Sequence, residues 1–166
     1  SRLTFEKCKK YRLMQLVGRE ANRFHFLSDS DRLTEDDKKI YHAMISLSDG
    51  MYSMNEEVLI SSLKILSELL YKHYGKKTIL LIDEYDVPLD KAFQNGYYKE
   101  MTTLIRGMFG EALKTNDSLQ FAVLTGCLRV SKEVFLQDLI ILKSYLLQIH
   151  ALMSNLDLLM KKFKGY

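Results

Sequence analysis

Apolar residues recur along much of this chain at the three- and four-residue spacing that places side chains on one face of an α-helix. The clearest stripe lies in residues 55–73 and is formed by Leu59, Ile60, Leu63, Leu66, Leu69 and Leu70. Residues 53–55 offer N-cap side chains, and Gly75 suits the position after the last turn. Weaker patterns predict a helix within residues 5–27, a polar break over 27–32, and a helix from Thr34 to Asp49-Gly50 whose apolar face includes Ile40, Met44, Ile45 and Leu47.

Two apolar runs, residues 78–82 and 119–125, have strand character. The first has no polar alternation, which is typical of a parallel strand buried on both faces. A loop containing Pro88 and Asn95-Gly96 follows it, and residues 97–115 then show a helical pattern. Because strand, helix and strand follow one another at this spacing, we expect a βαβ unit with parallel strands. The fold class predicted is a helix-rich α/β domain of three layers, with helices flanking a parallel sheet.

Composition narrows the class of protein. With 166 residues, 47% hydrophobic and 27% charged, the chain fits one globular domain. A net charge of +3 is too small to indicate nucleic-acid binding by itself. Cys8 and Cys127 are the only cysteines, so neither a disulfide framework nor a thiolate zinc site is expected. A charged N-terminus and the lack of a long uninterrupted apolar run favour a cytoplasmic protein without a membrane span.

Candidate chemistry gathers where the two predicted strands end. Asp83, Glu84 and Asp86 follow the first strand, and Thr125 closes the second, with Arg129 soon after. Ligands bind beyond the carboxyl ends of parallel strands. One acid there can hold Mg²⁺ beside phosphates while its neighbour orients water, which is the Walker B pattern. From the residues alone, a solvated acidic turn is an equal alternative, and a nuclease-like cluster of the three acids is a third, although no lysine follows at D/E-x-K spacing.

Four separated segments resemble the predicted AAA-ATPase-like family of bacteria, in which a nuclease-like domain of the PD-(D/E)XK type often follows. They are residues 66–77 (LSELLYKHYGKK), 81–89 (LIDEYDVPL), 95–98 (NGYY) and 121–133 (FAVLTGCLRVSKE), and the resemblance spans roughly residues 25–133. It implies that the intact protein binds and hydrolyses ATP with Mg²⁺. Asp83 would hold the metal, Glu84 would act as the catalytic base, and Thr125 would be the sensor. Arg129 is a candidate phosphate contact, and Asp86 is either a further metal ligand or a turn acid.

The phosphate-binding half of such a site is not found in these 166 residues. None of the eight glycines opens a G-x-x-x-x-G-K-[ST] loop, whose amides and lysine grip the phosphates. We therefore expect residues 1–133 to be a partial AAA-ATPase-like domain with negligible ATP affinity and no turnover. Nucleic acid would be bound only through a nuclease-like domain that the chain lacks. The alternative function is a non-catalytic interaction scaffold formed by the α/β core and the leucine-rich tail, with an unknown protein partner.

Residues 134–166 form an apolar tail that departs from the family pattern. One possible set of codons for Val134-Phe-Leu-Gln-Asp, when read one base earlier, encodes Ser-Ile-Phe-Thr-Gly, which is the stretch the family usually has at this place. The same shift converts one possible set of codons for residues 154–162 into a second family stretch containing Phe-Gly-Phe-Thr. We hypothesise a single-base deletion near the codon for Glu133, which makes the tail an out-of-frame translation. The alternative is an amphipathic helix that covers a core or binds a partner.

Overall fold

The structure, a computed structural model, describes residues 2–114 and 116–126. The elements in chain order are α1 (Arg2–Asn22), a 3₁₀ helix (His25–Asp29), α2 (Glu35–Ile45), β1 (Leu47–Ser48), β2 (Met51–Tyr52), α3 (Glu56–Tyr74), β3 (Thr78–Ile82), α4 (Val87–Gln94), α5 (Tyr98–Lys114) and β4 (Leu119–Leu124). Helices dominate the described residues, and β3 and β4 form a small parallel sheet. The fold is therefore a helix-rich α/β arrangement, as predicted.

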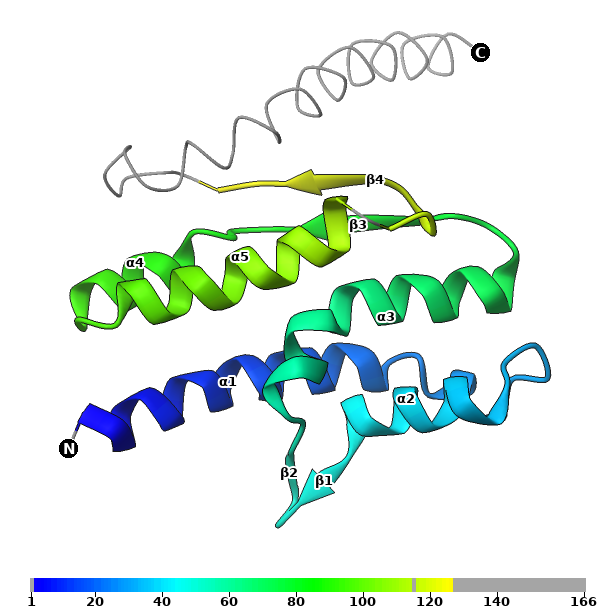
Figure 1. Cartoon of the computed structure of the whole chain (residues 1–166), viewed down its shortest axis with the longest axis horizontal. Coiled ribbons are helices and arrows are strands. Elements are labelled where there is room, and N and C mark those ends of the chain that lie inside the picture. The colour runs from blue at the N-terminus through cyan, green and yellow to red at the C-terminus, as the bar shows by residue number, and fades with distance from the viewer. Residues whose placement is uncertain (1, 115, 127–166) are drawn as a thin grey trace, which may run out of the picture. The chain divides into compact units, whose positions relative to one another are not determined.

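The helices of the described residues pack on one side of the sheet. Figure 1 shows α3 and α5 between the β3–β4 pair and the helices α1 and α2. One apolar cluster joins α2, the 3₁₀ helix and α3 through Leu27, Leu33, Tyr41 and Leu69. A second cluster of Met54, Leu59 and Leu104 joins α3 and α5 and packs against α1. These two clusters hold the helical layers beneath the sheet.

Helix caps account for three boundaries that the sequence predicts. The Thr34 hydroxyl accepts a hydrogen bond from the Asp37 amide, and the Asp37 carboxylate accepts one from the Thr34 amide, which forms a capping box. At the start of α3, the Asn55 side chain accepts a hydrogen bond of 2.7 Å from the Val58 amide. Gly75 ends α3 with a left-handed φ of 67°. Both predicted helix starts and the predicted stop at Gly75 are confirmed.

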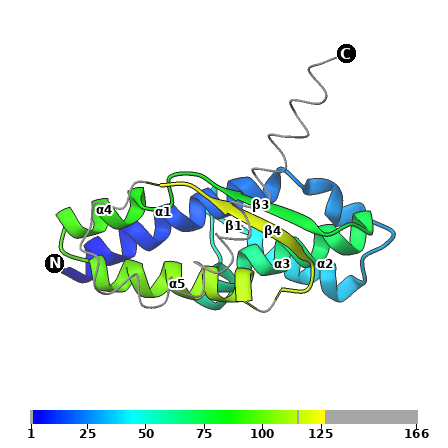
Figure 2. The ribbon, with the colours of Figure 1, turned by 90° about the horizontal axis from the view of Figure 1, so that it is seen from above.

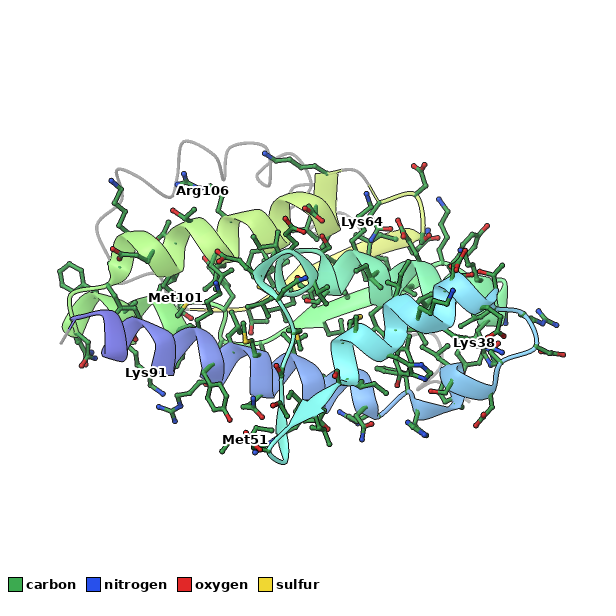
Figure 3. The ribbon with its side chains drawn as sticks, turned by 60° about the horizontal axis from the view of Figure 1, so that its bottom comes forward. Lys38, Met51, Lys64, Lys91, Met101 and Arg106 are labelled. Carbon is green, nitrogen blue, oxygen red and sulfur yellow. The ribbon has the colours of Figure 1, made fainter. Side chains whose placement is uncertain are left out.

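A β-hairpin occupies the segment predicted as the last turn of α2. The helix ends at Ile45, and β1 pairs with β2 in antiparallel register. Asp49 and Gly50 have φ values of 52° and 76°, as a two-residue hairpin turn requires. Leu47 therefore leaves the predicted apolar face and is 58% exposed, and Met51 projects from the hairpin tip (Figure 3). An Asp-Gly pair between short strands was the signal for this turn.

The apolar face predicted for α2 is only partly correct. Met44 is buried, but Ile40 is 45% exposed. Tyr41, which the spacing did not select, is fully buried in its place. Its hydroxyl donates a hydrogen bond of 2.9 Å to the Ala21 carbonyl at the end of α1, so an aromatic ring with a satisfied polar end occupies the core.

Two predicted breaks are structured. The predicted polar break over 27–32 contains part of the 3₁₀ helix, and Leu27 within it is completely buried. The predicted loop around Pro88 is wrong, because α4 forms there with Pro88 in its first turn, where a missing N–H costs nothing. Leu89 and Ala92 bury the inner face of α4. Eight residues are too few to reveal a helical period in the sequence.

The sheet confirms the predicted βαβ order but not the predicted burial of its first strand. Partners in the parallel register run from Thr78 and Leu119 to Ile82 and Leu124, with an irregularity after Thr78, and Figure 2 shows the two strands side by side. Alternate residues of β3 are exposed, Ile79 by 53% and Leu81 by 75%. Burial on both faces is therefore wrong for β3, because the helices of the described residues cover only one face.

No helix in the described part of the chain has the length and apolar character needed to cross a membrane. The predicted tail, residues 134–166, lies outside the described residues.

Candidate functional site

The acidic turn after β3 lies beside the end of β4, as the sequence predicts. The Thr125 amide donates a hydrogen bond of 2.9 Å to the Ile82 carbonyl, which extends the strand pairing to the end of β3. The Tyr85 amide donates one of 3.1 Å to the Thr125 carbonyl. These backbone contacts bring residues 83–86 and residue 125 to the same carboxyl edge of the sheet.

Thr125 contacts both members of the acidic pair. Its hydroxyl donates a hydrogen bond to Oδ1 of Asp83 and accepts one of 3.3 Å from the Glu84 amide. A hydroxyl has one donor and two acceptor lone pairs, so the two contacts are compatible. The three predicted site residues are thus brought together by one side chain, and all three are exposed to solvent.

Glu84 has an unusual backbone conformation. Its φ of 51° is left-handed, which is uncommon for a residue with a Cβ and costs about 1–3 kcal/mol. The Glu84 carbonyl accepts a hydrogen bond of 3.1 Å from the Val87 amide at the start of α4. Glu84 therefore lies in a turn between the strand and the helix, and its φ sets the direction in which the side chain leaves the backbone.

Asp86, the remaining acid of this turn, lies at the start of α4. The Asp86 carbonyl accepts a hydrogen bond of 2.8 Å from the Asp90 amide, so Asp86 begins α4 and is only partly exposed. Its role as a metal ligand stays a prediction. Arg129 lies outside the described residues, so its role as a phosphate contact also stays a prediction.

Asp83, Glu84 and Asp86 do not form a three-ligand metal cluster. Within residues 2–114 and 116–126, no group of three or more acidic, His or Cys side chains is placed to share a metal ion. The nuclease-like alternative, which needs the three acids to converge, therefore has no support here. A cation at this edge would depend on one or two of these carboxylates and on other oxygen ligands such as water, which is how Mg²⁺ is commonly held beside phosphates.

Tyr85 and Gly126 are parts of this turn that the sequence patterns did not select. A Cβ placed on Gly126 would lie 2.5 Å from Oδ1 of Asp86 and 3.0 Å from two ring carbons of Tyr85. Gly126 is therefore a position where the backbone and two side chains approach closely. A glycine directly after a strand was the available signal for such an approach.

The oxygen chemistry of this edge suits one half of a nucleotide site. A carboxylate and a hydroxyl from neighbouring strands are ligands that a hard cation such as Mg²⁺ prefers. The 166 residues contain no glycine-rich loop that could hold phosphates. The oxygen donors at this edge are thus of the type that Mg²⁺ prefers, and the sequence lacks the glycine-rich loop that would hold phosphates beside it.

A family model described as predicted AAA-ATPase matches residues 5–135. Because the match covers most of the chain, the chain belongs to this AAA-ATPase-like family. The match begins at residue 5, so it includes α1, whereas the motif resemblance began near residue 25. Searches of curated proteins and of solved structures returned no significant match.

Proposed function

We propose that this chain is part of an AAA-ATPase-like domain that binds and hydrolyses ATP with Mg²⁺, and that it carries the Walker B and sensor positions of that domain. The observation that supports this most is the contact of Thr125 with both Asp83 and the Glu84 amide at the carboxyl edge of β3 and β4. A solvated acidic turn needs no polar partner on the neighbouring strand, whereas a site that responds to a terminal phosphate does.

The proposal gives each residue one task. The Asp83 carboxylate would hold Mg²⁺, mostly through water, and Asp86 would support it from the start of α4. The Glu84 carboxylate would orient a water molecule and accept its proton. Thr125 would link the two acids to β4, and Arg129 would offset negative charge on the phosphates. Mg²⁺, when bound, would polarise the terminal phosphate.

We further propose that the complete domain is a three-layer P-loop fold and that the described sheet is its central part. The exposed side of β3, with Ile79 and Leu81, is the face that a second helical layer would cover. The glycine-rich loop would come from residues outside this sequence. Without it, the 166-residue chain is expected to have negligible ATP affinity and no turnover, because backbone amides and a lysine supply most of the grip on phosphates.

Two titrations of the full chain test the site. Mn²⁺, followed by electron paramagnetic resonance, should bind weakly, and Asp83→Asn should weaken this binding at least tenfold. The matched control is Asp31→Asn, an exposed acid in the loop before α2 that loses the same charge. Mn²⁺ binding that is equal in both variants would reject Asp83 as a ligand. Calorimetry with Mg²⁺–ATP should show no low-micromolar binding, and such binding, if lost in Asp83→Ala, would overturn the proposed inactivity.

The second candidate function is a non-catalytic interaction scaffold. The exposure of Ile79 and Leu81 on one face of the sheet favours it, because exposed apolar residues on adjacent positions of a face mark many binding surfaces. A chain that is monomeric and unfolds cooperatively would support the scaffold. Aggregation or rapid proteolysis of the purified chain would support a remnant of the ATPase domain.

The frameshift hypothesis for residues 134–166 is tested by the gene's DNA. The family match ends at residue 135, close to the codon at which the hypothesis places the deletion. If the alternative frame downstream of Glu133 does not encode the family stretches, the hypothesis is rejected. The neighbouring DNA would also show whether a glycine-rich loop and a nuclease-like domain, the proposed route to nucleic acid, flank this segment. Cytoplasmic localisation stays a prediction.

A further inference from the structure

The ring of Tyr85 packs against two parts of the fold. It is partly buried and lies against the backbone of Gly126, where an added Cβ would be 3.0 Å from its Cδ1 and Cε1. On another side it meets Phe109 of α5, with ring centroids 6.4 Å apart and planes at 65°. Burial, and then the nearby Asp86 carboxylate, raises the pKa of Tyr85.

The backbone of Tyr85 is fixed to the same strand end as its ring. The Tyr85 amide donates to the Thr125 carbonyl at 3.1 Å, and Thr125 directly precedes Gly126. Tyr85 therefore contacts two adjacent residues after β4, Thr125 through its amide and Gly126 through its ring. Glu84 is the residue before Tyr85, and the peptide bond that joins them cannot turn without moving either the hydrogen bond or the ring.

The left-handed conformation of Glu84 needs such a constraint. A non-glycine residue at a φ of 51° persists only where its surroundings outweigh the strain. Glu84 itself makes two single hydrogen bonds and is exposed to solvent. Its amide donates to the Thr125 hydroxyl, and its carbonyl accepts from the Val87 amide. The residue that follows Glu84, by contrast, is held by its backbone at Thr125 and by its ring at Gly126 and Phe109.

We infer that Tyr85 is a positioning residue for Glu84: its ring, seated between Gly126 and Phe109, holds the Glu84 backbone left-handed and thereby sets the direction of the carboxylate. Gly126 is required because any side chain there would occupy the place of the ring. A use of the positioned Glu84 carboxylate in catalysis rests on the proposed function, whereas the effect of Tyr85 on the φ of Glu84 does not.

Nuclear magnetic resonance of the full chain tests the inference directly. The coupling between the amide and Hα protons of Glu84, together with its ¹³Cα shift, reports whether φ is left-handed. Tyr85→Ala should move both toward values for an ordinary extended or helical residue and should speed hydrogen exchange of the residue-85 amide about tenfold, the effect of losing one net hydrogen bond. Tyr85→Phe keeps the ring and should retain the native values of both. A changed coupling in Tyr85→Phe would instead assign the positioning to the hydroxyl.

Gly126→Ala provides an independent perturbation, and Gly110→Ala is its matched control. An added methyl group at Gly110 meets nothing within 4 Å, whereas at Gly126 it meets Tyr85 and Asp86. Gly126→Ala should change the Glu84 signals as Tyr85→Ala does, and Gly110→Ala should leave them unchanged. If Tyr85→Ala does not fold, Gly126→Ala and the milder Phe109→Leu carry the test.

The outcomes separate this inference from the proposed function. Unchanged Glu84 couplings in folded Tyr85→Ala, or in folded Gly126→Ala, would overturn the positioning role. Altered couplings, restored in Tyr85→Phe, would support it even if Asp83→Asn leaves Mn²⁺ binding intact, and in that case only the metal assignment would fail.

Discussion

The hydroxyl of Thr125 donates a hydrogen bond to the carboxylate of Asp83, which joins the ends of two parallel strands through side chains. The same hydroxyl accepts from the Glu84 amide, so its removal affects both acids. Thr125→Val should lower the free energy of unfolding by no more than about 1 kcal/mol because the pair is exposed. It should also speed hydrogen exchange of the Glu84 amide. Thr125→Ser, which keeps the hydroxyl, should show neither change, and equal behaviour of Ser and Val would reject the contact.

The lowered pKa of Asp37 predicts that the fold loses stability in acid. Burial opposes its ionisation, but the Lys72 ammonium, whose Nζ lies 2.6 Å from Oδ1, and the hydrogen bonds from Thr34 outweigh this effect and lower the pKa of Asp37 below 3.8. A carboxyl whose pKa is lowered by folding stabilises the fold above its unfolded value, and this contribution disappears as the pH falls through the folded value. The free energy of unfolding should therefore decrease below about pH 4.

Urea unfolding from pH 7 to pH 2.5 measures this dependence. Asp37→Asn should be less stable than the native chain at pH 7 by about 1–2 kcal/mol and should lose the acid-dependent part of the curve. Asp36→Asn is the control, because Asp36 lies in the same helical turn but pairs with Lys39 on the exposed surface. An acid profile that Asp37→Asn leaves unchanged would contradict the assignment.

The raised pKa of Tyr41 predicts that the fold loses stability in alkali. Burial, and then the neighbouring Tyr52, raises the pKa of Tyr41 from 10.0 to about 12. Its stabilising contribution is complete below pH 10, the unfolded value, and is lost as the pH rises toward and through the folded value.

Tyr41→Phe should remove this alkaline loss and, at pH 7, should lower the free energy of unfolding by about 1 kcal/mol, because the Ala21 carbonyl loses one of its two donors and keeps the Phe24 amide. Thermal unfolding at pH 7 and pH 10.5 provides the measurement. Tyr71→Phe is the control at an exposed tyrosine in α3. The assignment fails if both variants keep the same alkaline loss.

A side chain at Gly18 is expected to clash where α1 contacts the β1–β2 hairpin. A Cβ on Gly18 would lie 2.3 Å from Cγ of Tyr52. Tyr52 cannot retreat easily, because its amide and carbonyl both bond to the Gln15 side chain, at 3.0 and 2.8 Å. Gly18→Ala should therefore lower the free energy of unfolding by about 1–3 kcal/mol.

The matched control for Gly18→Ala is Gly110→Ala. It places the same methyl group in open space within a helix, where alanine should instead stabilise by up to about 1 kcal/mol. Urea unfolding of the two variants compares them at one pH. Similar stabilities would show that the close approach at Gly18 is not present in solution.

The features that the sequence predicted correctly depend on local chemistry. Thr34 and Asn55 satisfy free amides within three residues, so the starts of α2 and α3 could be located without tertiary information. The parallel pairing of β3 and β4 followed from their order around a helix. Asp83, Glu84 and Thr125 could be placed together because parallel strands end at one edge.

The features that the sequence did not predict depend on contacts between distant residues or on ambiguous signals. Asp49-Gly50 ends helices as readily as it turns hairpins, and only the pairing of Leu47 with Tyr52 decides between them. The burial of Tyr41 depends on the carbonyl of Ala21, twenty residues away. The packing of Tyr85 against Gly126 likewise depends on how closely two strand ends approach, which no periodicity reports.

The alternating exposure of β3 has a practical consequence for handling this chain. Apolar side chains exposed on one face of a strand offer a surface on which a second molecule can pack, which promotes aggregation. Leu81 is 75% exposed, so replacing it with lysine would cost little folding free energy while adding a charge that repels a second copy. Light scattering of concentrated samples should fall in Leu81→Lys, which makes this position a practical handle for preparing the protein in quantity.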